Sequence, residues 1–407
     1  KLVEARERRH LHAVNLSVDL NMPVLILKAN MPGMKKNTPE SMVILNTMTG
    51  LSKSLFDVFR EARVESVDGD YHILALRDDI WHLKRVCVYL EETHALGRMM
   101  DFDVFLEGEG ITRGDLGFAR RRCFLCERDA AVCARLGTHD MTEMKAFIVS
   151  SVRGFLLEAL SEQSEQALLK ELYLNPCLSL VGPEGSGIHK DMNISHFLAS
   201  IEALKPYFRH YLVLGMDLSR HYHTLRKAGL RGEKAMFEAT GGVNTHKGAH
   251  FIFGLVLPVF MDSVLNHASL DTFKANLKAM AEVLLEDDFK TLKAPFTTGE
   301  ALYRETGTKG IRGEALRGFP GIFEWYPEKE ESGFQKLIRI MARIDDTTLL
   351  KRKIDLVGMK KALKSCEMRG FKGLSEVKDT YAHASPGGAA DILALVYFLE
   401  ATDHLLK

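Results

Sequence analysis

The sequence predicts a multidomain protein, with an α+β domain over residues 1–146 followed by an all-α helical domain over residues 147–407. Short apolar runs bounded by turn residues, at 23–33 and 71–76, are typical of strands in the first part. From Met144 onward, long apolar repeats at helical spacing replace these runs. A chain of 407 residues is long enough for two or three domains, each with its own core.

The elements of the first part follow from the spacing of apolar residues. Residues 1–20 place apolar positions beside the charged stretch ARERR, which predicts an amphipathic helix. Apolar positions over 38–63 favour a helix that is broken or kinked near Gly50. Residues 83–90 fit a helix or a third strand, and the Ala-rich stretch 130–135 favours a helix.

Composition excludes several classes of function. Lys and Arg together number 54, and Asp and Glu also number 54, so the chain has no net charge. Binding to nucleic acid or to an anionic membrane through overall electrostatics is therefore not expected. The longest uncharged apolar run, 251–261, is shorter than the roughly 18 to 20 residues of a membrane span, so we predict a buried core segment.

Cysteine usage indicates a reducing compartment. Six cysteines in a chain of this size, three of them between residues 123 and 133, do not resemble a disulfide framework. The printed sequence shows no basic stretch followed by an apolar leader. We therefore expect a cytoplasmic protein.

An Asp-x-Asp pair stands in the most highly charged part of the first domain. Asp101 and Asp103 are two residues apart, so on a strand both side chains point to the same face. Two such carboxylates can share one Mg²⁺ with substrate phosphates, as metal-assisted nucleotidyl transfer requires. The nearby Arg98 and Arg113 support phosphate binding. The alternative is that both aspartates are surface or helix-capping acids.

Three cysteines and a histidine follow this pair. Cys123, Cys126, Cys133 and His139 form a Cys-x2-Cys-x6-Cys-x5-His pattern. Four such side chains can make a closed tetrahedral zinc site, although the spacing differs from the usual ones. The alternative is three reduced cysteines that pack as small apolar groups.

The second domain contains a glycine-rich segment, 233–248, that we interpret as an anion cradle. Glycines let backbone amides approach a ligand, and Lys247 and His246 can neutralise phosphate. A helix that begins at about Ala249 would point its positive end at the same place. Glu233 would lie about two turns upstream, on the face that leads into this loop. The alternative is a plain connector whose glycines only permit positive φ.

Further segments place acids, bases or glycines at predicted helix ends, and they contain His189, Asp191, Arg312, Asp345, Asp346, Gly387, Gly388 and Asp391. Each has a structural alternative: an acid in the first turn of a helix stabilises the helix dipole, and a basic glycine loop can simply be solvated. No Walker A sequence is present, so a P-loop would not hold ATP.

Several motifs of the second domain occur together in one enzyme family. They are HKDM at 189–192, E-x-x-M at 233–236, TGGVNTHKG at 240–248, IRGEA at 311–315, DT at 346–347 and SPGGAAD at 385–391. Through them residues 147–407 resemble the triphosphoribosyl-dephospho-CoA synthases of citrate lyase and malonate decarboxylase maturation.

The first domain carries the motifs NMPG at 30–33 with following lysines, GRMMDFDV at 97–104 and RRCFLCERDAAVCAR at 121–135 with His139. Through them residues 1–146 resemble apo-citrate lyase phosphoribosyl-dephospho-CoA transferase, which implies a nucleotidyltransferase-like domain. The resemblance covers essentially the whole chain, and the chain resembles the fusion of the two enzymes.

The resemblance implies glycosyl transfer in the second domain. The 2'-hydroxyl of 3'-dephospho-CoA would attack C1' of the ATP ribose and expel adenine, through a transition state of oxocarbenium character that needs carboxylates. The catalytic candidates are His189, Asp191, Glu233, Asp346 and Asp391, with Asp345 as a Mg²⁺ ligand. The candidates for nucleotide and triphosphate binding are Gly241, Gly242, Asn244, Thr245, His246, Lys247, Gly248, Arg312, Gly387 and Gly388.

For the first domain the resemblance implies that a serine of the citrate lyase acyl carrier protein, its gamma subunit, attacks the α-phosphorus and releases pyrophosphate. Asp101 and Asp103 would carry Mg²⁺, and Arg98 and Arg113 would contact the phosphates. Two alternatives stay open: the same chemistry for malonate decarboxylase, and a non-catalytic helical scaffold for citrate lyase assembly. The family pattern Pro-Gly-Leu-Val-Asp is replaced by LSLVG at 178–182, which removes an acid near the nucleotide.

Overall fold

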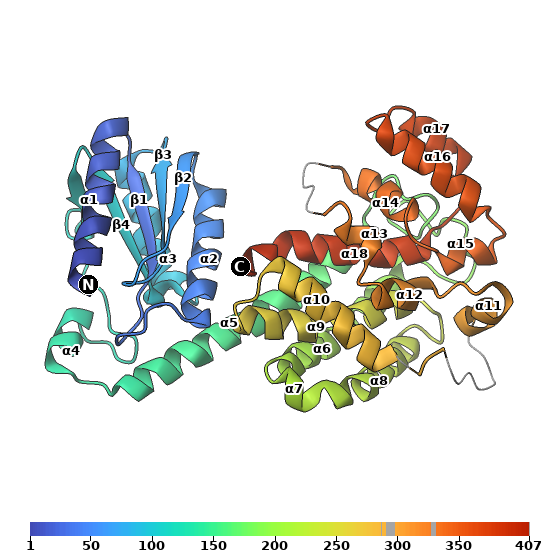
Figure 1. The fold of residues 1–407 in the computed structure, drawn as a ribbon, viewed down its shortest axis with the longest axis horizontal. Coiled ribbons are helices and arrows are strands. Elements are labelled where there is room, and N and C mark those ends of the chain that lie inside the picture. Colours follow the sequence, from blue (N-terminus) through green and yellow to red (C-terminus); the bar gives the residue numbers. More distant parts are fainter. Residues whose placement is uncertain (286, 290–297, 327–330, 407) are drawn as a thin grey trace. The chain divides into compact units, whose positions relative to one another are not determined.

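The computed structural model describes residues 1–285, 287–289, 298–326 and 331–406. The chain forms two compact units, Lys1–Leu156 and Leu157–Ser263 with Ala268–Leu406 (Figure 1). The predicted boundary at residue 147 falls inside the long helix α5 (Met141–Leu172), which passes from one unit into the other.

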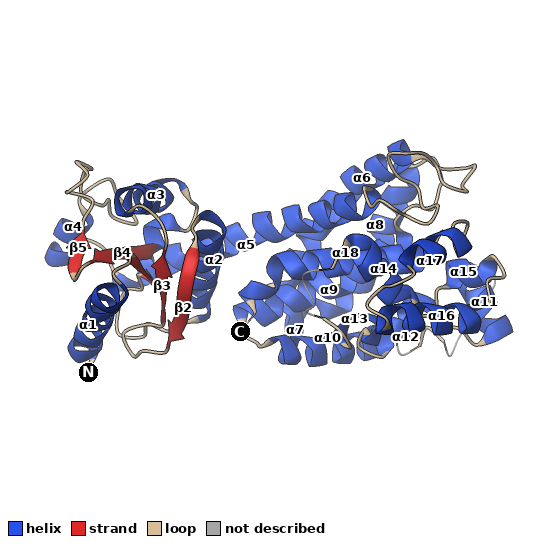
Figure 2. Cartoon of the chain, turned by 90° about the horizontal axis from the view of Figure 1, so that it is seen from above, coloured by secondary structure: helices blue, strands red, loops and turns tan. Residues whose placement is uncertain are grey.

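The first unit is an antiparallel sheet with helices on both faces, so the α+β prediction is confirmed. Its strands are β1 (Val24–Ala29), β2 (Val58–Val64), β3 (Tyr71–Leu76), β4 (Met100–Leu106) and β5 (Glu109–Ile111), in the order β2-β3-β1-β4-β5. Helix α1 (Leu2–Leu20) covers one face, and α2 (Pro39–Leu55) and α3 (Ile80–Thr93) cover the other (Figure 2). The 3-10 turn η1 (Gly97–Met99) and helix α4 (Ala130–Leu136) complete the unit.

Side chains along each strand alternate between the two faces of the sheet. On the face that α1 covers, an apolar core is followed by a polar edge. Val24 and Ile26 of β1 pack there with Ala13 of α1 and Phe105 of β4. Lys28 continues the same row, because side chains two apart on a strand share a face. The apolar core of this face therefore ends at Lys28, where charged residues begin.

Two details of the first unit differ from the sequence predictions. Helix α2 is continuous through Gly50 and ends at Leu55. Residues 58–64 then form strand β2 instead of extending the helix. Five central residues of β2 are exposed, so the strand lacks the apolar alternation that would have identified it. Residues 83–90 lie within the helix α3.

In the described part of the second unit the regular structure is helical, as predicted. After α5 the helices are α6 (Ile194–Gly215), α7 (Leu218–His221), α8 (Leu225–Ala239), α9 (Lys247–Leu265), α10 (Leu270–Leu285), α11 (Thr298–Thr306), α12 (Gly310–Leu316), α13 (Pro320–Phe323), α14 (Gly333–Met341), α15 (Thr347–Lys351), α16 (Leu356–Met368), α17 (Leu374–Thr380) and α18 (Gly387–Thr402), with 3-10 turns η2 (Tyr222–Thr224) and η3 (Asp403–Leu405).

Helices α9 and α18 form the centre of this unit. Phe253 and Phe260 of α9 both pack edge-on against Phe398 of α18. By length and composition α9 is apolar enough to cross a membrane, but 72% of it is buried among the other helices. It is the core segment that the apolar run 251–261 predicted, and its N-terminus delivers Lys247 and Gly248 to the cavity described below.

Candidate active sites

The first candidate site lies on the α1 face of the sheet, where β1 ends and β4 begins. Lys28 is paired with Asp101 in the register of these strands, and Ile26 is paired with Asp103. Both carboxylates therefore lie on one face together with Lys28. Desolvation by the surrounding chain and repulsion from Asp101 raise the pKa of Asp103. A cation bound between the two aspartates would relieve this repulsion.

Three cations surround a buried carboxylate beside this pair. Asp68 Oδ2 lies 2.7 Å from Arg9 Nη1 and 3.6 Å from Lys28 Nζ, and Asp68 Oδ1 lies 3.0 Å from Arg6 Nε. Burial alone would raise the pKa of Asp68, but the hydrogen bond from Arg9 and the charge of Lys28 hold this pKa below its ordinary value. Sequence reasoning missed this cluster, although Lys28 is the one cation in the apolar strand VLILKA.

Lys28 of this cluster and the nearby Lys36 both have lowered pKa values. Burial and the neighbouring Arg9 lower the pKa of Lys28. Burial also lowers the pKa of Lys36, which follows the NMPG turn and donates a hydrogen bond to the Met31 carbonyl. Asp101 and Asp68 act electrostatically on both lysines, so the cluster and the Asp-x-Asp pair form one site.

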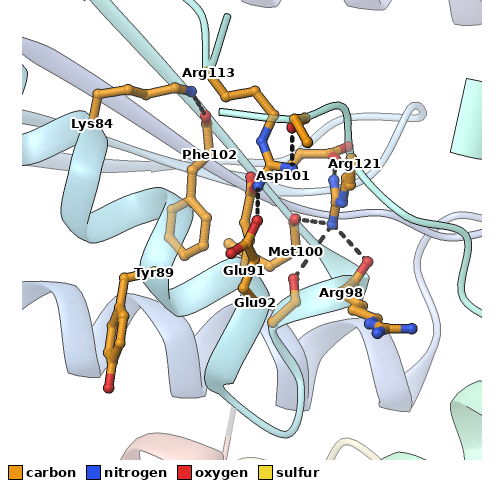
Figure 3. A network of polar contacts seen from close by, with 12 residues as sticks. Lys84, Tyr89, Glu91, Glu92, Arg98, Met100, Asp101, Phe102, Arg113 and Arg121 are labelled. Atoms are coloured by element: carbon orange, nitrogen blue, oxygen red, sulfur yellow. Dashed lines mark hydrogen bonds and ion pairs between the residues drawn. The ribbon is translucent and has the colours of Figure 1, made fainter. Parts of the chain in front are cut away.

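Arg121 connects the Asp-x-Asp strand to the segment that follows it. Its guanidinium forms an ion pair with Asp101 and donates hydrogen bonds to the carbonyls of Arg98, at 2.6 Å, and Met100 (Figure 3). Lys84 of α3 donates to the Phe102 carbonyl at 2.9 Å. The hydrogen bonds from Arg121 and Lys84 hold the backbone near the start of β4, and this fixes the direction of the Asp101 side chain.

The two predicted phosphate-binding arginines are engaged elsewhere. Arg113 donates to Glu91 at 3.1 Å and Glu92 at 3.2 Å, and it also binds the Ala119 carbonyl (Figure 3). Arg98 donates to the Cys123 carbonyl at 3.3 Å and lies 3.7 Å from a Glu127 carboxylate oxygen. Phosphate binding by these arginines stays a prediction; the cation paired with Asp101 is Arg121, and Lys28 lies opposite Asp101 in the strand register.

The predicted cysteine and histidine cluster is assembled. Cys123, Cys126, Cys133 and His139 each offer one ligand atom, and these atoms all lie within 4.8 Å of one another. The Sγ atoms of Cys126 and Cys133 are 3.5 Å apart, and His139 Nε2 is 3.3 Å from Cys126 Sγ.

The second candidate site is a cavity of about 530 Å³ in the helical unit. Its lining brings together five residues that the sequence singled out, namely Glu233, Asn244, Lys247, Gly248 and Arg312. It also includes polar residues that sequence reasoning missed, among them Tyr211, Arg226, His250, Asp288 and Glu300. Except for His250, which follows the glycine motif by two residues, these come from segments distant in the chain, so no local motif could have revealed them.

Opposite charges alternate along the cavity wall. Lys247 Nζ at the start of α9 lies 2.6 Å from Glu233 Oε1 of α8. Asp288 pairs with Arg226, and its second oxygen lies 3.3 Å from Arg312 Nη1. Cations on this wall can bind phosphate, and Glu233 is a carboxylate within reach of the same space.

A buried histidine orders the junction of α8 and α9. His250 Nε2 lies 3.0 Å from the Gly229 carbonyl and 3.1 Å from the Tyr211 hydroxyl. A Cβ atom on Gly232 would overlap the His250 ring, so a glycine is required there. Burial lowers the pKa of His250, which keeps the ring neutral near pH 7.

Asp391 lies directly behind the cavity wall. It is half-buried in α18 and accepts a hydrogen bond from the Ala249 amide at the start of α9. Burial, and then the nearby Glu171 and Asp346, raise the pKa of Asp391. Burial raises the pKa of Glu171 to about 8. Glu171 is therefore mostly protonated near neutral pH, and Asp391 positions the α9 terminus through its contact with the Ala249 amide.

Asp346 joins the starts of two helices instead of facing the cavity. Its Oδ1 accepts from the Thr348 amide at 2.8 Å, and its Oδ2 accepts from the Ala389 amide at 2.9 Å. Gly388 permits this approach, because a Cβ atom there would lie 3.0 Å from the Asp346 Cγ atom. The Gly387 amide donates to Thr348 Oγ1 at 3.0 Å. These contacts are those of a capping acid.

His189 lies with this second group, since its Nε2 atom is 2.8 Å from the Ser385 hydroxyl that precedes α18. Asp191 is exposed in the loop before α6, and Asp345 pairs with Lys360. None of these three residues lines the cavity.

The glycine loop does not form the predicted cradle as a whole. Gly241 and Gly242 have φ of 63° and 89° and terminate α8, with the Gly242 amide donating to the Phe237 carbonyl at 2.7 Å. His246 is buried, and its Nδ1 atom lies 2.8 Å from Ser200 Oγ. Burial lowers the pKa of His246 to about 3, so it is a neutral packing residue. The Thr245 hydroxyl is also buried, and among the described residues it has no hydrogen-bond partner.

Comparisons with known proteins cover both units. A family model described as "Apo-citrate lyase phosphoribosyl-dephospho-CoA transferase" matches residues 1–154, and one described as "ATP:dephospho-CoA triphosphoribosyl transferase" matches residues 157–407. The chain is 30% identical to "Protein CitXG" of Leuconostoc mesenteroides, over 98% of this chain and 96% of the relative. It is 31% identical to "Protein CitXG" of Haemophilus influenzae, over 98% and 94%. A Haemophilus ducreyi "2-(5''-triphosphoribosyl)-3'-dephosphocoenzyme-A synthase" is 30% identical over 67% of this chain and 98% of its own length.

Proposed function

Because the chain belongs to the CitXG family, which joins the two maturation enzymes of citrate lyase, we propose that this one polypeptide makes the prosthetic-group precursor from ATP and 3'-dephospho-CoA and attaches it to the acyl carrier protein. It is a bifunctional transferase. The family model that matches residues 1–154 is described for citrate lyase, so the malonate decarboxylase alternative is not favoured.

The first reaction takes place in the cavity of the helical unit. Lys247, Arg226 and Arg312 bind the triphosphate of ATP, since they are the cations paired along one wall. The negative charge of Glu233 stabilises the oxocarbenium character at C1' as the bond to adenine breaks, and Glu233 then accepts the proton of the 2'-hydroxyl as the new bond to C1' forms. Adenine leaves and the triphosphate stays on the ribose.

Magnesium fits the donor groups of both sites. In the cavity, Asp288 and Glu300 are carboxylates beside the phosphate-binding cations, and in the first unit Asp101 and Asp103 share one face. Mg²⁺ bound there would neutralise phosphate charge in both reactions. The predicted ligand Asp345 does not line the cavity and is paired with Lys360.

The second reaction takes place at the polar edge of the sheet, in what we propose is a nucleotidyltransferase-like site. The carrier serine attacks the α-phosphorus, and pyrophosphate leaves toward Lys28, Lys36 and Arg9. Arg121 holds Asp101 in place beside this position.

The observation that carries the synthase assignment is the ion pair between Glu233 and Lys247 at the N-terminus of α9. This pair lines a cavity that holds further paired cations. The test is to incubate the purified chain with ATP, Mg²⁺ and 3'-dephospho-CoA and to measure free adenine and the adduct by mass spectrometry. We expect both products, and a loss of about a hundredfold in rate for Glu233→Gln. Glu238→Gln, on the same helix but outside the cavity, is the control and keeps the wild-type rate. A folded wild-type protein that releases no adenine would refute the assignment and favour the scaffold alternative.

A further inference from the structure

The segment 121–139 has almost no apolar core of its own. Of its residues only Cys123 and Cys133 are buried. The apolar side chains Val132 and Leu136 are 39% and 68% exposed, while Phe124 and Leu125 are half-buried and Phe124 stacks on Phe147 of α5. A segment of this kind usually requires a cross-link or a metal to hold one conformation.

The backbone of this segment brings four ligand groups to one point. The Cys123 amide donates to the Arg128 carbonyl and the Ala130 amide donates to the Arg121 carbonyl, both at 2.8 Å, which closes a short hairpin. Cys123 and Cys126 lie in that hairpin. Helix α4 follows at once, capped by Asp129, and supplies Cys133. The chain then reverses at Gly137, with φ of 57°, and returns His139 to the cluster.

The distances suit a tetrahedral zinc ion and not a disulfide. Two sulfur ligands at about 2.3 Å from Zn²⁺ in tetrahedral geometry lie about 3.8 Å apart. The Cys126 and Cys133 sulfurs are 3.5 Å apart, and the four donor atoms lie within 4.8 Å of one another. A disulfide would join only two of the sulfurs, at about 2.05 Å, and would leave the third cysteine and the histidine without a function. All six cysteines are free thiols.

We propose that Cys123, Cys126, Cys133 and His139 bind one structural Zn²⁺, and that this zinc site holds Arg121 against Asp101. A set of three cysteines and one histidine fills a tetrahedral zinc ion completely, so the site has no open position for catalysis. The ion replaces the apolar core that the segment lacks.

Two contacts connect the zinc site to the strand that carries the Asp-x-Asp pair. Arg121 lies two residues before Cys123, and its guanidinium contacts Asp101 and the carbonyls at the start of β4 (Figure 3). The Cys123 carbonyl in turn accepts a hydrogen bond from Arg98 at 3.3 Å. Loss of zinc would release Arg121 and allow the Asp101 carboxylate to change direction. Arg121 is thus a positioning residue, and this role rests on the proposed transferase function, whereas the metal site does not.

The first measurement is metal content. The reduced, full-length protein is equilibrated with Zn²⁺, desalted and analysed by elemental mass spectrometry. We expect one zinc per chain in the wild type and in Cys177→Ser, whose half-exposed thiol lies in the helical unit. Cys126→Ser and Cys133→Ser should each retain at least about tenfold less zinc per chain than the wild type. Wild-type protein that retains no zinc, or equal loss in Cys177→Ser, would overturn the proposal.

The second measurement follows the consequence of the metal. In Cys126→Ser, amides of 121–139 should exchange hydrogen faster than in the wild type, while amides of β1 and β3 keep their protection. The Mg²⁺ concentration for half-maximal carrier-protein modification should rise about tenfold, and adenine release by the helical unit should be unchanged. Zinc binding with unchanged exchange and unchanged Mg²⁺ dependence would refute the positioning of Arg121 but leave the transferase function intact. Failure of the transferase function would instead abolish modification in the zinc-loaded wild type.

Discussion

Gly248 and Asp391 are packed so closely that a Cβ atom at position 248 would overlap the Asp391 Oδ2 atom and lie 2.9 Å from its Cγ atom. The same Cβ atom would lie 2.9 Å from Ile311 of α12. The start of α9, the start of α12 and the Asp391 carboxyl of α18 therefore meet at this glycine, directly behind the cavity that holds Glu233 and Lys247.

Replacement of Gly248 tests this packing. Gly248→Ala should lower the free energy of unfolding of the helical unit by about 2 kcal/mol and reduce adenine release, because the methyl group displaces the Asp391 carboxyl. Gly154→Ala is the matched control: this glycine is exposed within α5, a Cβ atom there meets nothing within 4 Å, and the change should stabilise by about 0.5–1 kcal/mol. Equal effects of the two substitutions, by denaturant unfolding, would contradict the close packing.

The buried carboxyl of Glu171 makes stability depend on pH. Its folded-state pKa is raised to about 8, so the folded protein binds this proton more tightly than the unfolded chain does. The free energy of unfolding should therefore fall as pH rises from about 4.5, near the unfolded pKa, to about 8. Glu171→Gln should match the wild type near pH 5 and exceed it at pH 8 by about 3 kcal/mol. Glu162→Gln, exposed on the same helix, should leave the pH profile unchanged, and an unchanged profile for Glu171→Gln would refute the assignment.

Lys247 should bind the triphosphate. Lys247→Gln removes a positive charge at the N-terminus of α9, so the KM for ATP in adenine release should rise about tenfold or more. Lys234→Gln changes an exposed lysine of α8 outside the cavity and should leave this KM unchanged. If only kcat changed in Lys247→Gln, Lys247 would not be a ground-state phosphate ligand.

The Asp-x-Asp pair should separate the two activities. Asp101→Asn should slow carrier-protein modification about a hundredfold with preformed precursor, while adenine release keeps its wild-type rate. Asp19→Asn, exposed on α1, serves as the control. Loss of both activities in a folded Asp101→Asn protein would contradict the assignment of the two reactions to two units.

Local sequence patterns predicted the fold class because amphipathic helices and buried strands leave periodic signals. The Asp-x-Asp strand and the α9 core helix were correct for this reason. The edge strand β2 was missed because its exposed residues show no such period. Patterns also predicted which stretches of the chain carry candidate catalytic and binding residues, but not the direction of each side chain.

His246 and Lys247 show what the sequence patterns could not predict. They are adjacent in one motif, yet His246 lies in the bend before α9 and Lys247 is the first residue of this helix, so their side chains point in different directions. Lys247 therefore lines the cavity, whereas His246 packs against Ser200 of α6. Arg226 and Asp288 lie 62 residues apart and meet only through the packing of helices, so a single sequence gave no signal for them.

The mass of the apo carrier protein tests the central claim most directly. Apo citrate lyase acyl carrier protein is incubated with the purified chain, ATP, Mg²⁺ and 3'-dephospho-CoA, and its intact mass is measured. The account predicts a gain equal to one phosphoribosyl-dephospho-CoA group, lost in both Glu233→Gln and Asp101→Asn and restored for Glu233→Gln by preformed precursor. An unchanged carrier mass, with a well-folded protein and a competent carrier, would contradict the bifunctional assignment.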